Sequence, residues 1–88
     1  MNSSEYLAVF KSLSYAGRVK NEFILSKRPK IIKTPKKILG GCSYSLLFPK
    51  EQLSDIKQAI KNQKRGFIGI YRQTEPNRYE VVSYDLPG

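Results

Sequence analysis

The sequence predicts a single α+β domain over residues 1–88, with a ferredoxin-like order of strands and helices and one extra strand at the C-terminus. A chain of 88 residues is long enough for one hydrophobic core. Short apolar runs typical of strands alternate with two segments whose apolar residues recur at helical spacing. Their order is strand, helix, strand, strand, helix, strand. This order favours two helices on one face of an antiparallel sheet.

The N-terminal half contains two expected strands around one helix. Residues 6–10 form a short apolar run of strand length. Ser12 or Ser14 can cap the helix that follows. The apolar residues of this helix are Ala16, Val19, Phe23 and Ile24, and we expect it to end at Arg28 and Pro29. Residues 30–33 are a brief second strand.

The C-terminal half continues with a strand, a helix and a hairpin. The expected strands are residues 44–48, 67–71 and 79–84. Pro49 starts the second helix, whose apolar stripe consists of Leu53, Ile56 and Ile60. Gly66 ends it. A turn at residues 75–77 makes the last strand a hairpin partner of the fourth, so residues 72–88 form a C-terminal hairpin extension.

Alternation along the strands at residues 6–10 and 67–71 assigns their side chains to two faces of the sheet. The side chains expected to face the helices are Leu7, Val9, Ile68 and Ile70. Those expected on the opposite face are Tyr6, Phe10, Phe67 and Tyr71. An open face of four aromatic residues is unfavourable in a soluble protein. We therefore expect the C-terminal segment, a second copy of the chain or a ligand to cover it.

The composition excludes several classes of function. The chain has no histidine, which argues against metal catalysis and against Ser-His or Cys-His hydrolysis. We expect no metal and no cofactor. No apolar run approaches the roughly 20 residues that a membrane span needs, and the N-terminus lacks the apolar region of a signal peptide. A single cysteine suits a reducing compartment, so we expect a cytoplasmic protein that binds no membrane.

The net charge of +9 is concentrated between residues 18 and 37. This basic segment contains eight lysines and arginines and one acid, Glu22. Clustered positive charge indicates an anionic partner, which could be nucleic acid, an acidic protein surface or a small anion. A basic face that is only solvated is an equal alternative.

The only cysteine, Cys42, lies in a glycine-rich and lysine-rich segment at residues 33–43. Neighbouring positive charge favours the thiolate, which is the nucleophilic form of cysteine. The lysines are Lys33, Lys36 and Lys37. Gly40 and Gly41 leave room for the backbone of a partner, and Pro35 stiffens the entry to the segment. The alternative is an inert cysteine, either buried or idle on the surface.

The chain resembles a family of small selenium/sulfur carrier-like proteins over roughly residues 6–71, and the segment around Cys42 carries the resemblance. In that family a Pro-Thr-Pro-Arg-like segment leads to a Cys-Gly pair before the third strand. Here Thr34, Pro35 and Lys36 match the Thr-Pro-Arg part and Cys42 matches the cysteine. Two positions depart from the pattern: Lys33 stands where the first proline is expected, and Ser43 where the glycine is expected.

The resemblance implies a carrier that does not turn over substrate by itself. Cys42 would accept sulfur or selenium as a persulfide or selenosulfide and pass it to a protein partner. The supporting residues would be Thr34, Pro35, Lys36, Lys37, Gly40 and Gly41. The basic charge suggests that this donor or acceptor protein is acidic. A homodimer remains open.

Two other functions remain as alternatives. The expected aromatic face could stack the bases of a nucleic acid, as in the RRM fold. The run Arg65-Gly66-Phe67 even begins like an RNP1 motif, but it follows the second helix instead of lying between the helices, so we interpret it as coincidental. The third possibility is a protein-interaction module with an idle cysteine.

Overall fold

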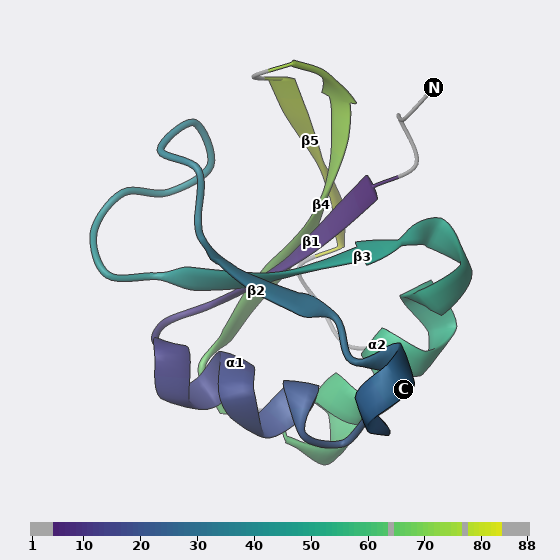
Figure 1. The fold of residues 1–88 in the computed structure, drawn as a ribbon. Coiled ribbons are helices and arrows are strands. Elements are labelled where there is room, and N and C mark those ends of the chain that lie inside the picture. The colour runs from purple at the N-terminus through teal and green to yellow at the C-terminus, as the bar shows by residue number, and fades with distance from the viewer. Residues whose placement is uncertain (1–4, 64, 77, 84–88) are drawn as a thin grey trace.

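The computed structural model describes residues 5–63, 65–76 and 78–83, which form a five-stranded antiparallel sheet with two α-helices (Figure 1). The elements are β1 (Glu5–Phe10), α1 (Leu13–Lys20), the 3₁₀ turn η1 (Leu25–Lys27), β2 (Lys30–Lys33), β3 (Tyr44–Pro49), the 3₁₀ turn η2 (Lys50–Gln52), α2 (Leu53–Asn62), β4 (Phe67–Glu75) and β5 (Arg78–Ser83). The strand order is β2-β3-β1-β4-β5. Figure 1 shows both helices on the same side of the sheet. None of the described helices is long and apolar enough to cross a membrane.

The predicted sequence of strands and helices is confirmed, with β5 as the extra strand. β4 is longer than expected, because it continues to Glu75 and pairs there with Arg78 at the start of β5. In α2 the buried residues Ile56, Ala59 and Ile60 form the apolar face, and Leu53 packs against it at the margin of the core. The stripe predicted for this helix therefore faces the sheet.

The first helix begins where predicted but ends earlier. The Ser12 hydroxyl accepts a hydrogen bond from the Tyr15 amide at 3.4 Å, which caps α1. The helix ends at Lys20, so the expected end at Arg28 is wrong. The Asn21 amide still donates to the carbonyls of the last turn, after which the chain leaves the core and Ile24 is exposed. Tertiary packing thus buries the first two apolar positions of the predicted stripe completely and leaves the last one outside the core.

The predicted assignment of β1 side chains to the two faces is wrong. Tyr6, Ala8 and Phe10 belong to the core cluster that includes the buried residues of both helices. Leu7 and Val9 therefore point to the other side of the sheet, where they are also buried. Residues 6–10 of β1 lie between β3 and β4 and are buried on both sides of the sheet, so no polar residue among them reveals the register. Glu5, the exposed residue of β1, precedes this run and alternates with Leu7 and Val9.

A β-bulge sets the faces of β4. The pairing with β1 shifts between Val9 and Phe10, so that Val9 lies opposite Gly69 whereas Phe10 lies opposite Phe67. Phe67 thereby comes onto the helix side, and its ring meets that of Phe10 edge to face with centroids 5.9 Å apart. Ile68 is the residue left without an opposite partner in the bulge.

The predicted aromatic face therefore does not exist as an exposed surface. Its members Tyr6, Phe10 and Phe67 pack toward the helices, and only Tyr71, opposite Leu7, lies on the other side. Residues 78–83 pair with β4 and form the edge strand of the sheet. The last residue of the segment expected as a cover, Tyr84, lies outside the described residues. Ile70 is the one predicted helix-facing residue of the four that lies in the helix-side core cluster.

Candidate functional site

The Cys42 loop, defined here as residues 34–43, joins β2 to β3 at one end of the sheet (Figure 1). Two contacts close its base. The Thr34 amide donates to the Ser43 carbonyl at 3.2 Å. The hydroxyls of Thr34 and Ser45 share a buried hydrogen bond of 2.7 Å. Thr34 is thus an anchor that ties the start of the loop to β3.

A tight turn follows the anchor. The Pro35 carbonyl accepts hydrogen bonds from the amides of Ile38 at 2.9 Å and Leu39 at 3.1 Å. The fixed φ of proline suits the first position of such a helical turn. Lys36 and Lys37 lie in the turn with exposed side chains. The turn therefore presents two positive charges to solvent from a backbone that its own hydrogen bonds hold.

The tip that carries the thiol is open. Gly40 and Gly41 are exposed, and no atom of another segment lies within 4 Å of the place where a Cβ would stand on either. Gly41 has φ of +87°, a conformation that glycine adopts without the strain a side chain would add. Cys42 is exposed, so the alternative of a buried cysteine does not apply. A partner can therefore reach the sulfur past a stretch of backbone without side chains.

Ser43 is a site residue that the sequence did not single out by its chemistry. It is only 4% exposed, and its hydroxyl oxygen is buried without a hydrogen-bond partner among the described residues. It occupies the position where the resemblance expects glycine. Burial explains why this position needs a small side chain. The only sequence signal was the departure from the Cys-Gly pair.

The basic segment at residues 18–37 keeps its charge exposed. Seven of its eight lysines and arginines are exposed, and Lys20 is half-buried. Within the described part of the chain, none of the eight forms a salt bridge. Arg28 is bound only to a backbone oxygen, that of Phe23, through its Nε at 3.0 Å. The segment therefore presents positive charge that no acid of the described chain neutralises.

The four residues suggested as a nucleic-acid stacking face do not form one. Tyr6 and Phe10 are buried at 6% and 0% exposure, and Phe67 packs against the same core. Tyr71 is half-buried and lies on the opposite side of the sheet. Bases stack only on rings whose faces are free, so this set cannot act as a platform.

Comparison with known proteins gives one match, to a family model. No curated protein and no solved structure shows a significant match to the chain. A family described as "Putative Se/S carrier protein-like" matches residues 5–72. The match covers more than three quarters of the sequence, and it includes the Cys42 loop and both α-helices. The chain therefore belongs to this selenium/sulfur carrier-like family.

Proposed function

We propose that the protein carries sulfur or selenium on Cys42 and delivers it to a protein partner. The observation that carries the proposal is the exposure of the only cysteine, at the open tip of an anchored loop, in a chain of this family. A carrier needs a thiol that two different proteins can reach in turn. An exposed sulfur that directly follows Gly40 and Gly41 meets that need, whereas a buried cysteine would not.

Loading is a thiol exchange. The Sγ thiolate of Cys42 attacks the outer sulfur of a persulfide on a donor protein. The new S–S bond forms as the donor's S–S bond breaks, and that electron pair leaves on the donor's inner sulfur as a thiolate. The transferred atom keeps its oxidation state, so no external oxidant or reductant takes part. A selenosulfide donor would react in the same way at selenium.

Delivery uses the same chemistry in the other direction. A nucleophile on the acceptor attacks the outer sulfur or selenium, and Cys42 leaves as a thiolate that is ready for the next cycle. The exposed lysines of the turn, Lys36 and Lys37, would support both steps by attracting an acidic partner. Free thiol chemistry of this kind suits a reducing compartment such as the cytoplasm.

The same proposal includes a finer fold assignment. The neighbour order β2-β3-β1-β4, with a helix in each of the β1–β2 and β3–β4 connections, supports a ferredoxin-like arrangement with β5 added at one edge. In that arrangement the β1–α1, β2–β3 and α2–β4 connections lie at one end of the sheet. The Cys42 loop would then belong to a surface built from three connections, large enough for a protein partner.

The test is intact-mass analysis after incubating the reduced protein with a cysteine desulfurase and cysteine. We expect a mass increase of one sulfur atom that dithiothreitol reverses. A parallel incubation with selenocysteine tests selenium. Cys42→Ala should show neither adduct, because the chain has no other thiol.

A matched control separates a specific carrier from any exposed thiol. The double variant Cys42→Ala/Ser54→Cys moves the thiol to an exposed position on α2, where lysines are also near in sequence. We expect it to load at least tenfold more slowly than the native protein at the same concentration. Equal loading of the two proteins would contradict the proposal and would favour an interaction module with an idle cysteine.

A further inference from the structure

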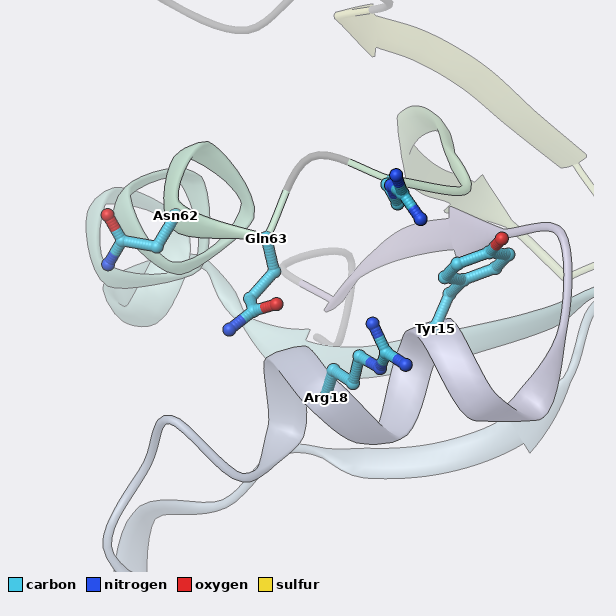
Figure 2. Close-up of a pocket in the computed structure, with 5 residues that line it drawn as sticks. Tyr15, Arg18, Asn62 and Gln63 are labelled. Atoms are coloured by element: carbon cyan, nitrogen blue, oxygen red, sulfur yellow. The ribbon is translucent and has the colours of Figure 1, made fainter.

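A second basic site, which contains no residue of the Cys42 loop, lies between the two helices. A pocket of about 270 Å³ is lined by Tyr15 and Arg18 of α1, Asn62 and Gln63 at the end of α2, and Arg65. Figure 2 shows Tyr15 and Arg18 projecting from α1, with Gln63 facing them from the end of α2. Asn62 points away from this space. The pocket is thus bounded by two helices and by the connection to β4.

The two arginines of the pocket are not neutralised. Among the described residues neither Arg18 nor Arg65 forms a salt bridge or a side-chain hydrogen bond. The one nearby acid with a defined contact, Glu22, accepts hydrogen bonds from the amides of Asn62 at 3.5 Å and Gln63 at 3.1 Å. Its carboxylate is therefore paired with amides. Two guanidinium groups thus line one small pocket, and no described acid lines it with them.

The wall of the pocket is fixed by a close contact between Tyr15 and Gly66. Gly66 has φ of +76°, and a Cβ on it would collide with the ring atoms Cγ, Cδ2 and Cε2 of Tyr15. The Gly66 carbonyl also accepts a hydrogen bond from the Lys11 amide at 2.8 Å, which ties this connection to the end of β1. The tyrosine ring therefore packs against backbone that the Lys11 hydrogen bond holds in place. Arg65 directly precedes Gly66 in this stretch of backbone.

We propose that this pocket binds a small phosphate-bearing molecule. A guanidinium presents donors in a planar fork that matches phosphate oxygens, and such charge-assisted bonds are about twice as strong as neutral ones. The volume is close to the lower end of ligand pockets, roughly 300 Å³, which suits a phosphate group with a short attached moiety. Arg65 was prominent in the sequence only through its place before Gly66 and Phe67. In the pocket it lies with Arg18, and the two arginines would bind the same ligand.

The experiment is a titration of the full chain at constant ionic strength, monitored by the amide signals in two-dimensional NMR. The probes are inorganic phosphate, pyrophosphate and a short single-stranded oligonucleotide. Pyrophosphate should shift the amides of Tyr15, Arg65 and Gly66 saturably. Arg18→Gln/Arg65→Gln should weaken this binding at least tenfold, because both charged donors are lost. Arg18→Lys/Arg65→Lys keeps the charge but not the planar fork of donors. Its affinity for pyrophosphate should lie between those of the native protein and the double glutamine variant.

The control variant Lys30→Gln/Lys50→Gln removes the same number of charges at exposed positions outside the pocket. We expect it to bind pyrophosphate within twofold of the native protein. An equal loss in both glutamine variants would overturn the proposal, because the net charge alone would then explain the binding. Shifts caused by the oligonucleotide but not by phosphate or pyrophosphate would also overturn it. Circular dichroism of each variant verifies that the fold is retained.

Discussion

The buried hydroxyl pair at the base of the Cys42 loop can be tested by a double-mutant cycle. Ser45 is 0% exposed and Thr34 6% exposed, so the 2.7 Å bond between their hydroxyls is screened from water. Thr34→Val keeps the shape of the side chain and leaves the Ser45 hydroxyl buried without its partner. That change should lower the free energy of unfolding by about 1–3 kcal/mol. Ser45→Ala should cost a similar amount for the same reason.

The double variant Thr34→Val/Ser45→Ala leaves no orphaned hydroxyl. Its loss of stability should therefore be no larger than that of either single variant, giving a coupling energy of about 1–3 kcal/mol. Ser43→Ala is the matched control, because it removes a buried hydroxyl that has no partner among the described residues. It should be neutral or stabilising by up to about 1 kcal/mol.

The assay is urea unfolding monitored by far-ultraviolet circular dichroism, because the chain has no tryptophan whose fluorescence could report unfolding. For a domain of this size each 1 kcal/mol corresponds to a melting-temperature change of about 4–8 °C, which thermal unfolding can verify. Additive losses in the double variant, together with a loss in Ser43→Ala as large as that in Thr34→Val, would refute the reasoning. The Thr34 anchor would then contribute nothing specific to the loop.

Three further predictions concern glycines and the thiol. Gly66→Ala should lower the free energy of unfolding in urea by about 1–2 kcal/mol from backbone strain alone, and its collision with the Tyr15 ring should add to this loss. A neutral result would contradict the close contact between Gly66 and Tyr15. Gly41→Ala should cost about 1 kcal/mol more than Gly40→Ala, because both positions are open but only Gly41 has positive φ; equal costs in unfolding experiments would argue against that loop conformation. Iodoacetamide should alkylate Cys42 in the native protein at a rate within about tenfold of that in urea, since the side chain is exposed; protection by several orders of magnitude would show a buried thiol.

Element order was predictable from the sequence, but the facing of the central strand was not. Residues 6–10 of β1 are buried on both sides, so two alternating sets of apolar residues compete for the helix side. The polar residue that could decide between them, Glu5, lies just before this apolar run. The larger aromatic set, Tyr6 and Phe10, fills the space under the helices together with Phe48. The bulge that brings Phe67 to the same side depends on pairing between distant segments. Local alternation contains no information about such pairing.

The Cys42 loop and the pocket of Arg18 and Arg65 also differ in how far the sequence alone predicts them. The Cys42 loop is continuous in sequence, so its glycines, lysines and exposed thiol could be predicted together. Arg18 and Arg65 come from segments far apart in the chain, and only the packing of α1 beside the end of α2 brings them to one pocket. The burial of Ser43 also depends on tertiary structure.

The central position of β1 has a consequence for the order in which the protein can fold during synthesis. Tyr6 pairs with Phe48 on one side and with Arg72 on the other, so β1 depends on two strands that are synthesised well after it. Such long-range pairing carries a large loop-closure cost and slows folding. A nascent chain that ends before β4 exposes one whole edge of an apolar strand, which is a template for aggregation. β4 must therefore emerge from the ribosome before the sheet can close around β1.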